Sequence, residues 1–294
     1  MENLLRKLGI VDTELYEQPL TAKAQATANT AGEKITFDVP CDQLLYGIDF
    51  KCAKDTDGAL ASNITEVELK LDGAKTIRNL SGAMLRAENI IDHQKGSTGF
   101  YHLPIAHPEL GADPISLNQF SSCQLTLTVG AAGSGVKNNV TPVLQLGSRS
   151  SYPKLSDIGL GKVLVEQFLP QKAYGANTGE QEYEHMRANE VLGYMYELGD
   201  NGTLSDSAFS YLTVQLWNSK GKKTLKEKVP FAQIKEQNTV DAFGNALGTG
   251  IFYVPFPSKI RTTDYTSIKS LLNIASAGTN CQARVLERYM LGGV

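Results

Sequence analysis

The stretch Gly99-Phe100-Tyr101-His102-Leu103-Pro104-Ile105 returns, with changes, as Gly250-Ile251-Phe252-Tyr253-Val254-Pro255-Phe256. In both stretches a glycine comes first, aromatic residues follow, and an aliphatic residue precedes a proline. Such a run predicts a short β-strand that ends at the proline, because proline cannot donate a backbone hydrogen bond to a neighbouring strand. The stretches are 151 residues apart (250 − 99) in a chain of 294 residues, which indicates a duplicated unit of about half the chain.

Three further pairs of segments occur in the same order in the two halves. Their offsets are 146 (193 − 47), 145 (212 − 67) and 158 (281 − 123), and insertions in loops produce such a drift. The pairs are 45–50 with 191–196, 67–71 with 212–216, and Cys123-Gln124 with Cys281-Gln282. Order and pattern together predict a duplication. The alternative is chance, since any chain rich in strands yields some matches of this kind.

Alternation of apolar and polar residues predicts strands throughout the chain. In the first half they are expected at 34–39, 45–50, 67–71, 99–104, 123–129 and 143–146. In the second half they are expected at 163–168, 191–198, 211–217, 250–255 and 281–290. Helical spacing predicts helices at 80–91, with Ser81 as the N-cap, at 229–237 and at 267–275.

Many short strands with few helices, in a unit of about 130 residues, are typical of an eight-stranded jelly roll and not of a parallel α/β sheet. We therefore expect an all-β fold, a double jelly roll of two tandem eight-stranded rolls with short inserted helices. The predicted division is an N-terminal arm at 1–32, a first jelly roll at 33–150 and a second at 160–294. The linker is placed at about 148–161, where serine, proline and glycine replace the periodic pattern.

Composition excludes several classes of protein. The net charge of −3 and a pI of about 5.9 do not favour a specific nucleic-acid partner. The densest basic segment, with five lysines between Lys220 and Lys228, is expected to be a solvated turn and strand edge. Four cysteines without zinc-binding spacing predict free thiols in a reducing compartment. We expect no leader peptide and no membrane-spanning segment.

The first residues carry an apolar face made by Leu4, Leu5, Leu8 and Val11. One interpretation is an extended arm that reaches a partner subunit or a lipid surface. The other is a frayed terminus with one short docked helix.

Histidine and carboxylate residues could serve as metal ligands. His102 and His107 lie near Glu109, but a jelly-roll metal enzyme would need a close histidine pair, a carboxylate and a third histidine. His93 and His185 have no partner at a recognisable spacing. We therefore expect no catalytic residues, no metal ligands and no cofactor.

Two other features could hint at ligands. Asp55, Asp57 and Gly58 are expected to form a turn, because the rest of a calcium-binding loop is missing, although calcium between subunits stays an open alternative. Trp217 is the only tryptophan, and core or rim packing is expected in preference to a platform for sugar binding.

The segment 64–73, followed by the helical segment 80–89, resembles a strand, turn and helix of one viral family, and 281–290 resembles that family's closing strand. The family is the double jelly-roll major capsid proteins of icosahedral viruses with an internal membrane, most closely those of corticovirus-like phages. The resemblance covers about 33–294, leaving the loops and the arm unmatched.

This resemblance implies a structural protein of the virion capsid and not an enzyme. It implies pseudo-hexagonal homotrimers that assemble, in the host cytoplasm, into an icosahedral shell around an internal membrane. The implied partners are further copies of the chain, minor capsid or penton proteins, and the viral membrane through the N-terminal arm.

Two alternatives from other functional classes remain. One is a carbohydrate-binding β-sandwich module, for example of a phage spike, which would be monomeric in solution. The other is a metal-dependent enzyme on a double-barrel fold, which would lose bound iron or zinc when His102 is replaced.

The predicted register can be tested by placing a charge in each roll. Leu127→Asp and Val285→Asp should each block folding, because an unpaired carboxylate would enter a barrel core. Circular dichroism and size-exclusion chromatography of the two variants check this. Soluble, native-like protein from either variant would refute the register.

Overall fold

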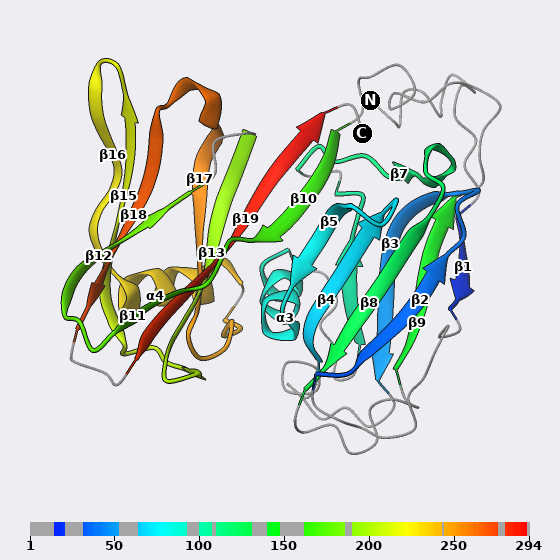
Figure 1. Cartoon of the computed structure of the whole chain (residues 1–294), viewed down its shortest axis with the longest axis horizontal. Helices are drawn as coiled ribbons and strands as arrows, with labels where there is room; N and C mark the ends of the chain where they lie inside the picture. Colours follow the sequence, from blue (N-terminus) through cyan, green and yellow to red (C-terminus); the bar gives the residue numbers. More distant parts are fainter. Residues whose placement is uncertain are drawn as a thin grey trace. The chain divides into compact units, whose positions relative to one another are not determined.

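Strands account for most of the computed structural model (Figure 1). The structure describes residues 15–20, 32–52, 64–92, 100–107, 110–130, 140–147, 162–185, 190–242, 244–275 and 280–292. The chain divides into two compact units. Of the described residues, the first unit holds those up to Asn89, those from Phe100 to Val165, and 290–292. The second unit holds 90–92 and those from Glu166 to Tyr289.

In its described part, the first unit has a five-stranded sheet with the path β1-β9-β3-β6, and a second run of paired strands in the order β2-β8-β4-β5. The short strand β7 (Ile115–Ser116) pairs with β3. One α-helix, α3 (Gly82–Ile91), precedes β6, and the 3-10 helix η1 (Leu117–Gln119) precedes β8. The strands are β1 (Leu15–Pro19), β2 (Lys34–Val39), β3 (Leu44–Cys52), β4 (Ile64–Leu71), β5 (Lys75–Leu80), β6 (Phe100–Pro104), β8 (Cys123–Val129) and β9 (Val140–Gly147).

The second unit repeats this arrangement. One sheet has the order β12-β18-β15-β16, and in the other β19 lies between β13 and β10, with β17 beside β13. Helix α4 (Phe231–Asp241) precedes β17, and η2 (Thr262–Asp264) precedes β18. The strands are β10 (Lys162–Phe168), β11 (Lys172–Gly175), β12 (Gly179–Glu184), β13 (Glu190–Asp200), β14 (Thr203–Leu204), β15 (Phe209–Asn218), β16 (Gly221–Pro230), β17 (Ile251–Arg261), β18 (Ser267–Ile274) and β19 (Cys281–Gly292).

Both units have the strand order of a jelly roll. When the short strands β7 and β14 are left out and β10 and β11 are counted as one, each unit has eight described strands. The first, eighth, third and sixth form one sheet, and the second, seventh, fourth and fifth form the other. In the second roll the first strand is interrupted, so that β10 and β11 both lie beside β19. The predicted all-β double jelly roll is confirmed.

The duplication extends to the pairing register. Gly47 pairs with Pro104 between β3 and β6, and Gly193 pairs with Pro255 between β13 and β17. The partner of Val67 is Leu127, and the residues 145 positions later (212 − 67 and 272 − 127), Leu212 and Leu272, are also partners. The two prolines of the repeated stretch therefore occupy equivalent places in two copies of one roll.

The helix predicted at 267–275 is wrong, since these residues form β18. Ile268, Leu272 and Ile274 are buried alternately along the strand, and Ser270 takes the fourth buried position. Because one of the inward positions holds a serine, the alternation of apolar and polar residues that predicts a strand is not visible in the sequence. The equivalence predicted between Cys123 and Cys281 is also wrong. The pairing shows that β8 corresponds to β18, the strand predicted as a helix, and not to β19.

The arm predicted at 1–32 is also corrected. Its residues Leu15–Pro19 form β1, the first strand of the first roll, which pairs with β9 from Leu15↔Gly147 to Pro19↔Val143. The apolar face at 4–11, the turn at 55–58 and the linker at 148–161 lie outside the described residues.

Other local predictions are confirmed. Ser81 caps α3, because its Oγ accepts a hydrogen bond from the backbone N–H of Met84 at 3.1 Å. The helix predicted at 229–237 is α4. Leu127 and Val285, the positions chosen for charge insertion, are fully buried. In the part of the chain that the structure describes, none of the helices has the length and apolar character needed to cross a membrane.

Candidate functional site

An asparagine in the helix of each roll binds the backbone of the repeated strand. In the first roll Asn89 Nδ2 donates to the carbonyl of His102 at 2.5 Å, and the N–H of His102 donates to Asn89 Oδ1 at 2.7 Å. In the second, Asn238 Nδ2 donates to the carbonyl of Tyr253 at 2.8 Å, and the N–H of Tyr253 donates to Asn238 Oδ1 at 2.9 Å. We call these two pairs the helix–strand clamps.

The clamps satisfy backbone groups that the sheets leave unpaired. β6 lies at the end of its sheet, and β17 has only β13 as a neighbour, so each has one open edge among the described strands. Buried backbone donors and acceptors without partners are costly, and open edges invite pairing with other chains. An asparagine amide supplies one donor and one acceptor, and both asparagines are at most 2% exposed.

The first clamp is held from the opposite side of β6. His102 Nδ1 lies 2.6 Å from Asp49 Oδ1, and Gln145 Nε2 donates to Asp49 Oδ2 at 2.9 Å. A Cβ atom at Gly47 would lie 2.4 Å from His102 Cε1, so the imidazole needs a glycine at that place. Arg78, which is fully buried, donates to the carbonyl of Pro104.

His102 is thus a structural residue in the first roll. The other histidine of the sequence-based candidate pair, His107, is buried and forms a backbone bridge with Ala112. Glu109 and His93 lie outside the described residues. Within the described ranges, no group of three or more His, Cys, Asp or Glu side chains is arranged to hold a metal ion.

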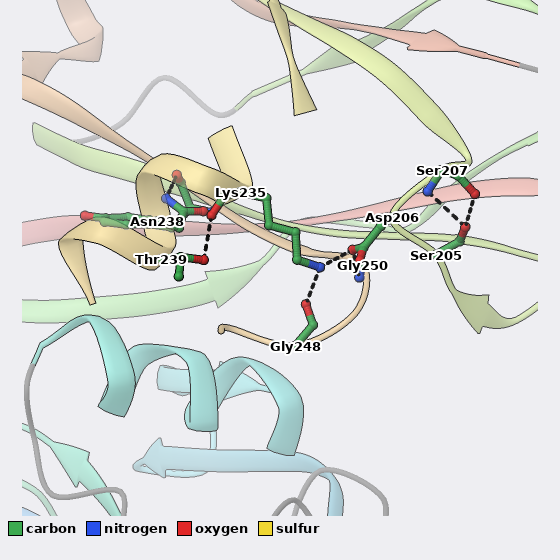
Figure 2. Close-up of polar contacts among 9 residues, drawn as sticks. Ser205, Asp206, Ser207, Lys235, Asn238, Thr239, Gly248 and Gly250 are labelled. Atoms are coloured by element: carbon green, nitrogen blue, oxygen red, sulfur yellow. Dashed lines mark hydrogen bonds and ion pairs between the residues drawn. The ribbon is translucent and has the colours of Figure 1, made fainter. Parts of the chain in front are cut away.

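The second clamp is anchored by a lysine of the same helix (Figure 2). Lys235 Nζ forms an ion pair with Asp206 and donates to the carbonyl of Gly248 at 3.0 Å. Asp206 Oδ1 in turn accepts the N–H of Gly250 at 2.7 Å. Gly250 has a φ of +69°, and a Cβ atom there would lie 2.4 Å from the carbonyl oxygen of Leu198. The glycine that opens the repeated stretch is therefore required by its backbone conformation and by its neighbours.

A buried polar network crosses the interior of the second roll. His185 Nε2 and the hydroxyl of Tyr196 each lie 2.7 Å from Ser270 Oγ. His185 Nδ1 lies 3.4 Å from Glu287 Oε1, and its ring stacks on Tyr194 with 3.9 Å between centroids. Burial lowers the pKa of His185 from its ordinary value of 6.5, while Glu287 acts in the opposite direction. The imidazole is therefore neutral at pH 7.

A buried arginine supports the second clamp. Arg288 Nη2 lies 2.7 Å from Asp92 Oδ2, and its Nε lies 2.8 Å from Glu166 Oε1. The guanidinium also lies 5.5 Å from the ring centroid of Tyr253, the residue whose backbone Asn238 binds. Removing either carboxylate would leave an arginine that is 1% exposed with an incomplete set of partners.

The surface of the second roll carries the remaining candidate features. Trp217 is 39% exposed, and Lys222 Nζ lies 5.8 Å from its ring centroid, so the tryptophan packs at the rim and one ring face meets an ammonium group. The lysine-rich segment forms the β15–β16 turn and the strand β16, at the end of its sheet, as predicted.

Cys41, Cys123 and Cys281 are free thiols. A pocket of about 150 Å³ lies between α4, β16 and β17, and Asn238 is among its lining residues.

Comparisons with known proteins show what the chain resembles. Residues 22–152 match the family model described as viral coat protein P2 N-terminal domain. A search of curated protein sequences found no match.

Solved structures of several viral proteins share the fold at low sequence identity. The major capsid protein P2 from bacteriophage PM2 matches with a TM-score of 0.64 and 13% identity, over 94% of this chain and 98% of that one. A chain of Sulfolobus Turreted Icosahedral Virus matches with a TM-score of 0.69 and 12% identity, over 95% and 90%. The Faustovirus major capsid protein matches with a TM-score of 0.59 and 6% identity, over 96% and 90%.

These findings confirm the resemblance to double jelly-roll major capsid proteins. The family model covers the first roll from β2 to β9, and the solved structures extend the shared fold over both rolls. The matched structures from bacteriophage PM2 and Faustovirus are major capsid proteins. The polar centres described above bind strand backbone and buried side chains.

We predict that the clamps are major sources of stability. Asn238→Ala leaves two buried backbone groups of Tyr253 without partners and should lower the free energy of unfolding by about 2–6 kcal/mol, at about 1–3 kcal/mol for each group. Gln233→Ala, an exposed residue of the same helix, is the matched control and should change it by less than about 0.5 kcal/mol. Urea denaturation measures both, and equal midpoints for the two variants would contradict a structural role for the clamp.

The neutral state of His185 predicts a loss of stability in acid. Because its pKa is lowered on folding, the unfolded chain binds more protons, and stability falls as the pH drops below the ordinary value of 6.5. The slope is at most about 1.4 kcal/mol per pH unit for this one group. Thermal denaturation of wild type and His185→Gln across this pH range measures the difference. Parallel curves for the two proteins would show that His185 is not the group responsible.

Proposed function

We propose that this chain, whose residues 22–152 match the viral coat protein P2 N-terminal domain, is the major capsid protein of an icosahedral virus with an internal membrane. It acts by self-assembly, through contacts between copies of the chain. The observation that carries the proposal is the duplication. Two rolls in one chain share strand order, pairing register and a helix–strand clamp.

A duplicated roll suits assembly as a homotrimer. Three copies of a chain with two equivalent rolls supply six similar barrels, which can give a pseudo-hexagonal outline suited to tiling a shell. A cyclic trimer needs a contact in which two different surfaces of the chain meet, because only such heterologous contacts close a ring of three. Permanent contacts of this kind bury about 2,000–5,000 Å².

Other partners follow from the geometry of an icosahedral shell. Hexagonal tiles cannot fill the fivefold vertices, so minor capsid or penton proteins are needed there. The apolar residues Leu4, Leu5, Leu8 and Val11 suit an arm that contacts the viral membrane. Free thiols at Cys41, Cys123 and Cys281 agree with assembly in the reducing cytoplasm of the host.

Measurement of molar mass in solution tests the proposed assembly. Multi-angle light scattering of the purified chain should give 95.7 kDa, three times 31.9 kDa. The trimer should persist on dilution to micromolar concentration, because permanent interfaces of this size dissociate slowly. A monomer under these conditions would count against a capsid subunit and in favour of a monomeric binding module.

A further inference from the structure

An arginine bridges the fifth and sixth strands of the first roll. Arg78 of β5 is fully buried and donates to the carbonyl of Pro104 in β6. The two strands belong to different sheets, so the guanidinium spans the space between the sheets at this side of the roll. Because Pro104 is the proline of the repeated stretch, the contact has an equivalent position in the second roll.

The second roll has a lysine and a pocket at the equivalent position. Arg78 pairs with Leu69 of β4. Lys226 pairs with Val214 of β15, 145 positions after Leu69 (214 − 69). Lys226 and Pro255, the second proline of the repeated stretch, both line the pocket of about 150 Å³ between α4, β16 and β17. The space that an arginine spans in the first roll is therefore open in the second.

Lys226 brings a positive charge to this pocket without a counter-charge. Its side chain is half-buried, and its ammonium forms neither an ion pair nor a hydrogen bond with the residues that the structure describes. None of the described residues that line the pocket carries a carboxylate. A partly buried charge without a partner costs free energy, so an anion in the pocket would be stabilised by Lys226.

The asparagine of the second clamp offers the pocket a hydrogen-bond donor. An asparagine amide nitrogen carries two hydrogens, and the bond from Asn238 to the carbonyl of Tyr253 uses one of them. Asn238 lines the pocket and is 2% exposed, and its second hydrogen has no acceptor among the described residues. Gln233, which also lines the pocket, adds an exposed amide. An acceptor that enters the pocket therefore meets an ammonium and amide donors.

Much of the remaining lining is apolar. The side chains are those of Val229, Ile234, Val254 and Pro255, with the ring of Tyr253. Inorganic phosphate would lose hydration against these side chains without compensation. An apolar cavity of about this volume holds benzene, so the space suits a chain of about four to six carbon atoms and excludes a long acyl chain. A carboxylate on a short hydrocarbon chain matches both the charge and the size of the pocket.

We propose that this pocket is a binding site for short-chain carboxylates of about four to six carbon atoms. The carboxylate pairs with the ammonium of Lys226 and accepts a hydrogen bond from the amide of Asn238. The hydrocarbon chain contacts Val229, Ile234 and Val254. The ligand thereby joins the fifth and sixth strands of the second roll, as the buried arginine does in the first. All the lining residues belong to the second unit, so the site does not depend on the proposed assembly.

Titration of the full chain with pentanoate tests the site. In methyl-labelled protein the NMR signals of Val229, Ile234 and Val254 should shift and saturate, with a dissociation constant on the order of 1 mM for a ligand of about seven non-hydrogen atoms. Pentan-1-ol and pentylammonium have the same chain length but no negative charge, and each should bind at least about tenfold more weakly. Signals that do not saturate, or an alcohol that binds as well as the acid, would overturn the proposal.

Two lysine variants test the charge contact. Lys226→Gln removes the ammonium in the pocket and should weaken pentanoate binding by at least about fivefold. Lys223→Gln, an exposed position of the same strand that does not line the pocket, is the matched control and should bind like the wild type. Circular dichroism checks that both variants are folded. Equal affinities of the two folded variants would refute the site, and if Lys226→Gln does not fold, the comparison of acid, alcohol and ammonium in the wild type decides.

Discussion

The fold depends on how each roll satisfies the backbone of its sixth strand. β6 and β17 have only one neighbouring strand among the described residues, so part of their backbone has no sheet partner. Asn89 and Asn238 meet this need with a donor and an acceptor from one side chain. Because each asparagine lies in a helix, the clamp also fixes the helix against the strand. The clamp thus pairs the backbone N–H and carbonyl of one residue in each sixth strand.

Much of the fold follows from patterns in the sequence. The repeated stretch and the alternating strands predict the duplication, because apolar periodicity reports burial on one face of a sheet. The structure brings Gly47 opposite Pro104, and Gly193 opposite Pro255, as the repeat requires. The prediction failed at β18, where a buried Ser270 interrupts the apolar pattern. That serine is inward because it bonds His185 and Tyr196, which lie far from it in sequence.

The clamps themselves were not visible in the sequence. An asparagine in a helix is unremarkable by composition, and only the strand beside it shows that its amide is used. The spacing of the two asparagines is consistent with the repeat, since Asn89 and Asn238 are 149 residues apart (238 − 89), close to the offsets of the other repeated segments. The strand β1 was missed because five residues ending in a proline carry too little pattern to stand apart from an arm. The buried ion pairs of Arg288 likewise depend on residues distant in sequence.

The proposed shell needs only this one chain for its tiles, since three copies of a chain with two equivalent rolls supply six barrels. The central claim is that this chain builds such a shell. Cryo-electron microscopy of particles from the source of the protein tests it most directly. The account predicts icosahedral particles whose shell consists mainly of this 31.9 kDa chain, arranged as pseudo-hexagonal trimers over a lipid bilayer. Particles whose shell is made of another protein, with this chain confined to spikes or absent, would contradict it.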